Sequence, residues 1–494
     1  MRRLAINAAV FILVFVTGCG LYRVNPPLSR DDLAAKRGYR YRNLTETPPN
    51  NTEKNFIIVT MSGGGTRAAA LAYGVAEHMS RAKLDRSGTT LLDEVDVISS
   101  VSGGSFAAAY LGLFGKDKFL QDFHRDVLER QIERDVLLRV AAPWNWPDML
   151  LYGRSDLAEK YYNDYIFDRR TYADMPRRRP YVILNATDLT TGAGFSFTQD
   201  DFDLICSDLQ RIPVARGVLA SSAFPVAFTP ITLKNYGQTE CGSNRPLWVT
   251  GALQDFQLNP TRFHRAEIWT SYEDAAARPY IHLSDGGIAD NIGLRGPEVS
   301  ISSTDSPWHV LDKKQVKRVA VIVVDAKSGS QGTIDRSSRR PLFTTVLEAS
   351  ATNPIDNYSF DTVESLRLFV EEQRKALEDY QTRKSDCDNL AAELCQGSSG
   401  RSCQQDHQQQ CYVALNATDA FRPRVPKYYE IHVQFEAIKD PAERAALEAI
   451  PTTLQLPNED IQRLEQAGRK VLDQSQVYQD LLADLRADSG SAGE

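Results

Sequence analysis

Short apolar runs alternate with helical patterns over the first two thirds of the chain. The runs are rich in β-forming residues and have the length of buried strands; they lie at 56–61, 91–106 (ending in a turn), 181–189 and 317–326. Between them, residues 65–82 and 120–140 carry apolar side chains at helical spacing. Buried strands separated by helical segments predict an α/β fold, with parallel strands and helices on both faces of the sheet.

The remaining segments have other textures. Residues 20–54 hold paired prolines and little apolar periodicity, which predicts a tether followed by a packing arm. A polar helical stretch at 361–384 precedes a Gln/Ser/Cys-rich segment, a late strand is expected at 427–438, and an amphipathic helix pair at 458–486. The expected divisions are a signal segment (1–18), a tether and arm (19–54), a core (55–330), a helical, Cys-containing insertion (331–425) and a C-terminal strand with helices (426–494).

The N-terminus has the pattern of an export signal. Arg2 and Arg3 precede an apolar stretch, Leu4 to Val16, whose 13 residues are too few to span a bilayer, because a helix needs about 20 for that. We interpret it as a signal peptide. The following Val16-Thr17-Gly18-Cys19 resembles the lipobox of bacterial lipoproteins, which implies lipid attachment to Cys19. Several acyl chains would anchor the protein firmly, since each buried CH₂ contributes about 0.8 kcal/mol.

The predicted anchor places the protein in a bacterial cell envelope. Gly20 stands where such lipoproteins often carry an aspartate for inner-membrane retention, so the outer membrane is the favoured location. The alternative is an ordinary secretory cleavage that leaves Cys19 as a free thiol. The six other cysteines can then form three disulfides in an oxidising compartment. They are Cys206, Cys241, Cys387, Cys395, Cys403 and Cys411.

The four clustered cysteines are spaced eight residues apart and allow three connectivities. Pairing Cys387 with Cys411 and Cys395 with Cys403 would staple a helical hairpin. A zinc site is the competing interpretation, but export and the wide spacing count against it. The sequence has no H-E-x-x-H motif or Cys/His ligand spacing, so we expect no metal and no cofactor.

Composition narrows the class of protein. The 494 residues include 57 basic and 64 acidic side chains, with a formal net charge of −7, which argues against a nucleic-acid binder. A mean hydropathy of −0.36 excludes a polytopic membrane protein. The 42% hydrophobic and 24% charged residues are typical of a globular chain.

A serine lies where the second predicted strand turns into a helix. Ser102 has Ser100 two residues before it and Gly104 two residues after it, so the segment is a G-x-S-x-G elbow with its first glycine replaced by serine. Small residues are needed there because the strand and the helix approach closely around a strained serine. The helix that follows points N–H groups, including that of Gly103, at the site. Such a cluster can also be a simple turn.

A glycine-rich loop follows the first predicted strand. Gly63, Gly64 and Gly65 allow successive N–H groups to face one cavity, as an oxyanion hole or a phosphate nest requires, and Arg67 comes soon after. The loop lacks the spacing of a Walker A or Rossmann motif. In a third segment, Asp285 follows an apolar pair and precedes Gly286 and Gly287. A carboxylate held there by a glycine turn can reach a neighbouring strand end, although Asp-Gly turns are common.

These three blocks, in this order over residues 55–330, resemble the patatin-like phospholipase family. The resemblance implies a three-layer α/β/α fold that hydrolyses acyl esters of lipids with a Ser–Asp dyad. Carried over by motif, Ser102 is the expected nucleophile and Asp285 its base. The expected oxyanion loop is Gly63, Gly64, Gly65 and Arg67, with the N–H of Gly103 as a further donor. Asn291 is expected to support the turn after Asp285. The family motifs say little about residues 331–494.

Two other interpretations remain open. Three of the seven histidines follow Asp285, so a Ser…Asp…His triad with His309 or His432 as base is possible. The protein can also be a lipid-anchored scaffold or binding protein that kept the fold and lost the chemistry. An aspartate with its usual pKa, about 3.9, is a poor base. A working dyad therefore predicts a dry, buried pocket around Asp285.

Overall fold

The computed structural model describes residues 21–225, 227–242, 245–302, 315–327, 338, 343–396, 401–418, 420, 422–423 and 425–490. A central eight-stranded sheet runs through the molecule in the order β5-β6-β3-β2-β1-β7-β8, with β4 paired to β3. The five strands from β3 to β8 are parallel, whereas β4, β5 and β6 join antiparallel. The strands are β1 (Asn55–Met61), β2 (Val95–Val101), β3 (Tyr181–Asp188), β4 (Gly194–Ser196), β5 (Ile231–Lys234), β6 (Tyr280–Asp285), β7 (Arg318–Val324) and β8 (Lys427–Val433).

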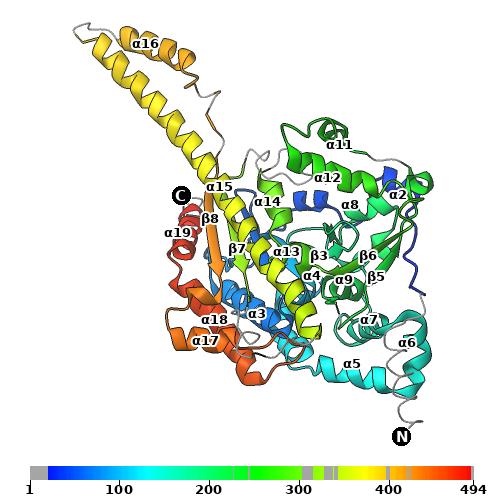
Figure 1. Ribbon diagram of the computed structural model, residues 1–494. Helices are drawn as coiled ribbons and strands as arrows, with labels where there is room; N and C mark the ends of the chain where they lie inside the picture. Colours follow the sequence, from blue (N-terminus) through cyan, green and yellow to red (C-terminus); the bar gives the residue numbers. More distant parts are fainter. Residues whose placement is uncertain are drawn as a thin grey trace.

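Helices enclose this sheet (Figure 1). Every residue of β1 and β2 is buried, so both faces of the central strands are covered, as their continuous apolar runs predict. The fold is the expected α/β class. The helices are α2 (Arg30–Ala34), α3 (Gly65–Arg81), α4 (Gly103–Phe123), α5 (Ile132–Ala141), α6 (Trp146–Tyr152), α7 (Arg154–Tyr165), α8 (Gln199–Phe202), α9 (Val214–Ser221), α10 (Gln238–Cys241), α11 (Leu247–Ala252), α12 (Pro260–Ser271), α13 (Gly287–Asp290), α14 (Arg295–Ser302), α15 (Phe343–Leu394), α16 (Arg401–Ala414), α17 (Pro441–Glu448), α18 (Asn458–Gln474) and α19 (Gln476–Gly490).

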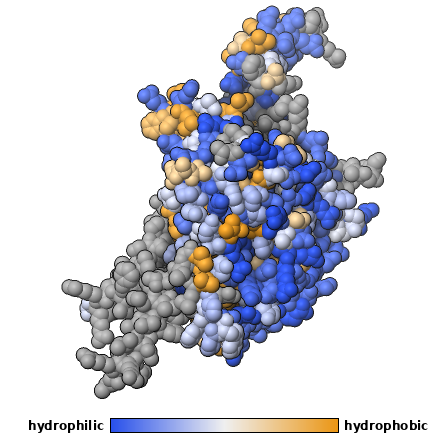
Figure 2. Space-filling view, turned by 90° about the vertical axis from the view of Figure 1, so that its right-hand side faces the viewer, coloured by the Kyte–Doolittle hydropathy of each residue, from blue (hydrophilic) through white to orange (hydrophobic). Residues whose placement is uncertain are grey.

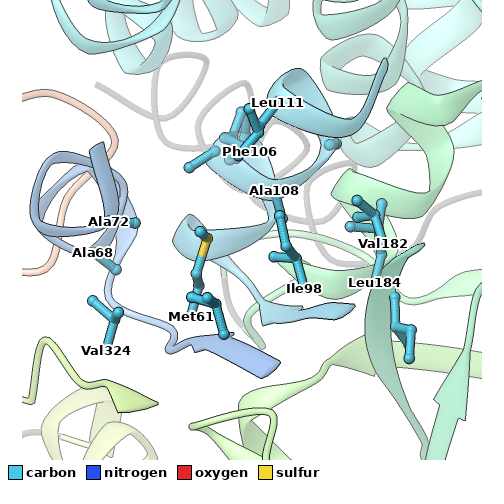
Figure 3. Close-up of a cluster of buried hydrophobic side chains, with 14 of the residues drawn as sticks. Met61, Ala68, Ala72, Ile98, Phe106, Ala108, Leu111, Val182, Leu184 and Val324 are labelled. Atoms are coloured by element: carbon cyan, nitrogen blue, oxygen red, sulfur yellow. The ribbon is translucent and has the colours of Figure 1, made fainter. Parts of the chain in front are cut away.

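Small side chains let α3 and α4 lie close to the sheet. Figure 3 shows Ala68 and Ala72 of α3 beside Val324 of β7, while Ala108 of α4 lies near Ile98 of β2. Alanine adds little bulk between backbones, so the large residues of the strands fill the space between the layers. This close packing fixes the first turns of both helices, which follow the glycine loop and the serine elbow.

The C-terminal region completes the same domain. β8 pairs in parallel with β7, and α18 packs on α3. The two helices touch at glycine: a Cβ on Gly74 would lie 2.4 Å from the carbonyl oxygen of Glu465. The described residues 426–490 therefore pack with the core expected at 55–330. No described helix has both the length and the apolar character of a membrane span.

Residues 21–54 and the α15–α16 segment differ in how they contact the core. Residues 21–54 pack along the core, where the guanidinium of Arg40 binds the Asp203 carboxylate at 2.5 Å and the Tyr39 hydroxyl donates to the Val182 carbonyl at 3.1 Å. By contrast, α15 and α16 form a hairpin that extends away from the sheet (Figure 1). Two nested disulfides, Cys387–Cys411 and Cys395–Cys403, staple it, and Cys206–Cys241 is the third.

Two helix predictions need correction. The single helix expected at 120–140 is divided, because α4 ends at Phe123 and α5 begins at Ile132 after a π-turn at His124–Leu128. Val127, Leu128 and Ile132, on and just after this break, are all buried in the core. The helix expected at 361–384 is the middle of the longer α15, whose apolar periodicity is interrupted by polar residues.

Candidate active site

Ser102 occupies a strained turn between β2 and α4. Its φ of 49° lies in the left-handed region, which a side chain adopts only when the surroundings impose it. Added Cβ atoms on Gly103 and Gly104 would lie 2.0 Å from the Gly65 carbonyl oxygen and 2.6 Å from that of Met61. Both positions therefore require glycine. Ser100 fits in place of the usual glycine because its buried hydroxyl donates to the Ile183 carbonyl at 3.2 Å.

Strand register brings Asp285 to the level of Ser102. Val101 is paired with Asn185 of β3, and the next β3 residue, Ala186, is paired with Asp285 of the antiparallel strand β6. β2 and β6 flank β3 on its two sides. The turn that follows β2 and the aspartate at the end of β6 therefore lie at the same level of the sheet. The Ser102 hydroxyl lies near enough to the Asp285 carboxylate to help lower its pKa.

Burial gives Asp285 the properties of a base. Its side chain is 5% exposed, and loss of hydration raises the pKa of Asp285 to about 6. The Gly287 N–H, which donates to the carboxylate at 2.8 Å, and the nearby Ser102 hydroxyl act in the opposite direction and lower this pKa. The carboxyl is thus a better proton acceptor than an exposed aspartate while still ionised at neutral pH.

The glycine loop faces the elbow. The N–H of Gly63 is occupied, because it donates to the Asn291 carbonyl at 2.9 Å. Gly64 and Gly65 have φ of 139° and 60°, which favour glycine. In the described part of the chain, the N–H groups of Gly64, Gly65 and Gly103 have no protein acceptor. They lie together, since Gly103 approaches the backbone of Gly65, and they can stabilise an oxyanion.

Arg67 is a buried anchor of this loop. Its Nε donates to the Ala326 carbonyl at 2.8 Å and its Nη1 to the Ile450 carbonyl at 2.6 Å. The loop between α17 and α18, residues 449–457, is called the C-terminal loop here and supports the glycine loop as well. The Thr66 N–H donates to the Thr453 carbonyl at 2.8 Å, and a Cβ on Gly65 would lie 2.3 Å from that oxygen. Arg67 therefore positions the N–H groups from behind.

Several supporting residues escaped the sequence analysis. Ser221 at the end of α9 binds the elbow through two atoms: its carbonyl and its hydroxyl accept the Ser102 N–H at 3.1 and 2.9 Å. Thr453 was also missed. Neither residue lies in a recognisable motif, and both act through contacts distant in sequence. Asn291 does more than expected, because it joins the Asp285 turn to the glycine loop through Gly63.

The two histidines considered as alternative bases, His309 and His432, are not found beside Ser102 among the described residues. His432 lies on β8, three strand spacings or roughly 14 Å from β2, and its Nε2 is 2.6 Å from the Glu430 carboxylate. His309 and Cys19 lie outside the described residues. In the described part, one cluster has metal-ligand geometry, formed by Cys395, Cys403 and His407, and its two cysteines are joined in a disulfide.

A comparison with protein families matches the segment that carries these residues. Residues 59–296 match the family model described as patatin-like phospholipase. This segment is a patatin-like phospholipase domain. It contains the glycine loop, the Ser102 elbow and Asp285, and it ends before β7, β8 and α18. The patatin-like domain is therefore completed by strands and helices beyond the matched residues.

A comparison with solved structures also returned matches. VipD from Legionella pneumophila has 12% identity and a TM-score of 0.31, covering 89% of this chain and 67% of that chain. Human GIVD cytosolic phospholipase A2 has 12% identity and a TM-score of 0.38, covering 93% of this chain and 66% of that chain. A search of curated protein sequences found no match.

Proposed function

We propose that this protein is a serine hydrolase that cleaves acyl esters of membrane lipids with a Ser102–Asp285 dyad. The observation that carries the proposal is the strand register that brings Ser102 beside a buried carboxyl, Asp285, whose pKa is raised to about 6. A structural Asp-Gly turn needs neither a strained serine nor unoccupied N–H groups beside it. The patatin-like domain supports a lipid as the acyl donor.

The reaction follows from the geometry. Ser102 Oγ attacks the ester carbonyl carbon while Asp285 accepts the hydroxyl proton, and the Gly64, Gly65 and Gly103 N–H groups stabilise the oxyanion. Asp285 then donates the proton to the leaving alcohol, which departs and leaves an acyl-serine. Water attacks this ester with Asp285 again as base, and the fatty acid leaves as Ser102 recovers its proton. Losing one oxyanion donor typically costs about 2.7–4 kcal/mol of barrier.

The test separates an enzyme from an inert scaffold. Ser102→Ala and Asp285→Asn should each abolish hydrolysis of a chromogenic fatty ester, and a fluorophosphonate should label the native chain but not Ser102→Ala. Ser222→Ala is the matched control, because Ser222 is buried nearby and both hydrogen bonds described for its hydroxyl stay within α9. Full activity in Ser102→Ala would overturn the assignment. Absence of labelling and turnover in the native chain would favour the scaffold.

We propose further that lipidated Cys19 anchors the protein in a bacterial outer membrane. The proposal rests on the lipobox-like Val16-Thr17-Gly18-Cys19, and the first described residue, Leu21, is 54% exposed. Mass spectrometry of the N-terminal peptide should show an acylated Cys19, and Cys19→Ser should release the protein from membranes. An unmodified thiol at this position would contradict the anchor.

A further inference from the structure

Apolar side chains are exposed on the segment formed by α5, α6 and the turn between them. Leu137 and Leu138 on α5 are 60% and 58% exposed, and Trp144 in the turn is 81% exposed. Trp146 and Leu151 on α6 are 37% and 40% exposed. Figure 2 shows a largely hydrophilic face with apolar residues in separate groups. Single exposed leucines are ordinary, but five large apolar residues within 15 positions suggest an interaction surface.

One side of this α5–α6 face adjoins the oxyanion loop. A cavity of about 680 Å³ opens between α5 and the C-terminal loop, with Leu137 and Leu138 on one wall and Leu456 and Pro457 on the other. The same C-terminal loop holds Thr453, whose carbonyl accepts the Thr66 N–H at 2.8 Å. An apolar molecule in this cavity would therefore lie close to the glycine loop.

The other side adjoins the segment that holds Asp285. Ser155, at the start of α7 directly after α6, donates from its hydroxyl to the Thr229 carbonyl at 2.6 Å and accepts the Thr229 N–H at 2.8 Å. Six residues earlier, the Ala223 carbonyl accepts the Asp285 N–H at 3.0 Å. The α5–α6 face thus lies between the supports of the oxyanion loop and the supports of the base.

The first described residues of the chain pack beside this face. Arg23 binds the Asp156 carboxylate of α7 at 2.8 Å, and its guanidinium lies 5.4 Å from the ring centroid of Tyr152 at the end of α6. Cys19 is four residues before Arg23, and an extended chain spans at most about 3.6 Å per residue. A lipid on Cys19 would be held within roughly 14 Å of Arg23, and so close to α6.

The orientation of the sheet also places the α5–α6 face at the same end of the molecule as the candidate active site. In Figure 1 the arrow of β8 points toward the end of the molecule where α5 lies, and the catalytic turns follow the carboxyl ends of the parallel strands β1 and β2. A second group of exposed apolar residues, on and after α11, lies toward the opposite end: Leu247, Phe256 and Leu258 are 92%, 60% and 88% exposed.

Charge does not define the partner of the α5–α6 face. Residues 129–156 contain four arginines and five acidic residues, so the segment has no excess positive charge for anionic headgroups. Tryptophan and leucine favour the boundary between headgroups and acyl chains of a bilayer. The chemistry therefore fits a lipid surface bound by apolar insertion.

We propose that the α5–α6 face is the surface through which this protein docks onto a lipid bilayer. Trp144, Leu137 and Leu138 insert among the lipids, and the cavity beside Leu456 receives the acyl chain of a lipid leaving the membrane. The choice of a bilayer rests on the proposed function, since it takes a membrane lipid as substrate. The position of the docking surface rests on the exposed residues and the N-terminal contacts.

Tryptophan quenching tests the surface without any turnover. The full chain carrying Ser102→Ala is reconstituted into phosphatidylcholine vesicles with brominated acyl chains, which quench indoles that enter the bilayer. We expect quenching to fall by roughly half or more when Trp144→Phe and Trp146→Phe are introduced, because these indoles are at the membrane interface. Trp248→Phe on α11 is the matched control and should leave it unchanged. Loss of quenching with Trp248→Phe instead, or equal quenching in all variants, would overturn the proposal.

A kinetic measurement tests whether the docking surface is needed for hydrolysis of a membrane lipid. Trp144→Ser combined with Trp146→Ser, two exposed residues outside the cavity, should lower hydrolysis of a lipid ester in phosphatidylcholine vesicles at least tenfold, while hydrolysis of a soluble short-chain ester is unchanged. Leu247→Ser combined with Leu258→Ser should change neither rate. Equal loss on both substrates would contradict a docking role. Absence of any ester hydrolysis in the native chain would refute the proposed function and leave the quenching result to decide the docking surface.

Discussion

The carbonyl oxygen of Ser221 accepts the backbone N–H of Ser102 at 3.1 Å. The same oxygen accepts the Gly286 N–H at 3.0 Å, so the end of α9 ties the serine elbow directly to the turn that carries Asp285. Two residues later, Ala223 accepts the N–H of Asp285 itself. The distance between Ser102 and Asp285 is therefore set by backbone hydrogen bonds to a third segment.

The Ser221 hydroxyl should matter for catalysis as well as for stability. It accepts the Ser102 N–H at 2.9 Å and donates to the Asn185 carbonyl at 2.6 Å. Ser221→Ala removes both bonds and should lower the free energy of unfolding by about 1–3 kcal/mol. It should also lower kcat, because the elbow loses one of its two supports. Thermal unfolding and steady-state kinetics measure the two effects.

Ser222→Ala separates these contributions. The Ser222 hydroxyl donates to the Val218 carbonyl at 2.8 Å, and none of its described hydrogen bonds reaches the elbow. Its removal should cost similar stability with kcat unchanged. Equal losses of kcat in Ser221→Ala and Ser222→Ala would contradict a positioning role for Ser221.

Turnover should depend on the ionised form of Asp285. Because burial raises the pKa of Asp285 to about 6, kcat/KM should rise with pH through that value and level off above it. A pH–rate profile of a soluble ester measures the ascending limb. A limb centred near pH 4, the range of an exposed aspartate, would show that Asp285 is not the buried base described here.

The raised pKa of Asp285 also predicts how the free energy of unfolding depends on pH. An aspartate in a salt bridge stabilises the fold as pH rises, whereas this buried aspartate destabilises it. Between pH 4 and 6 the folded state binds more protons at Asp285 than the unfolded state, so this group makes stability fall as pH rises. At pH 7 the buried carboxylate destabilises the fold by up to about 3 kcal/mol. Asp285→Asn should therefore raise the free energy of unfolding at pH 7 and lose this advantage at pH 4. Denaturant unfolding at both pH values measures it, and an equal effect at both would contradict the assignment.

Gly65 should tolerate no side chain. Its φ is 60°, and a Cβ would lie 2.3 Å from the Thr453 carbonyl oxygen, so Gly65→Ala must displace the oxyanion loop or the C-terminal loop. We expect kcat to fall by at least about 10²-fold, as for loss of an oxyanion donor. Gly88→Ala is the matched control, because Gly88 also has positive φ but nothing lies within 4 Å of its Cβ position. Comparable kcat values in the two variants would contradict the role of the loop.

The three disulfides should differ in their importance. Cys206 and Cys241 are buried and lie 35 residues apart in the sequence. A disulfide that closes a loop of this length lowers the conformational entropy of the unfolded chain, which stabilises the fold by about 4 kcal/mol. Cys206→Ser with Cys241→Ser should therefore lower the melting temperature clearly. Cys387→Ser with Cys411→Ser, in the protruding hairpin, should leave the melting of the core and the turnover of a soluble ester unchanged. A large loss of turnover in the hairpin variant would assign that hairpin a role in the site.

The sequence predicted most of the local structure around the site. The strands ending at Met61 and Val101 and the small residues at Gly103 and Gly104 appear where the patterns placed them, because continuous apolar runs and steric crowding are local demands. The nested pairing of Cys387 with Cys411 remained one of three possibilities until the hairpin of α15 and α16 placed those residues opposite each other.

The sequence alone determined which residue types this protein offers for chemistry: a serine in a turn that admits only small neighbours, glycines able to present N–H groups, and an aspartate before a glycine turn. Only the tertiary structure decided that Asp285 reaches Ser102, because that depends on an antiparallel strand and its register with Ala186. It also decided that Ser221, Thr453 and Ile450 hold the site from distant segments. Steric and conformational demands are written in neighbouring residues, whereas hydrogen bonds between distant loops form only once the sheet has brought them together.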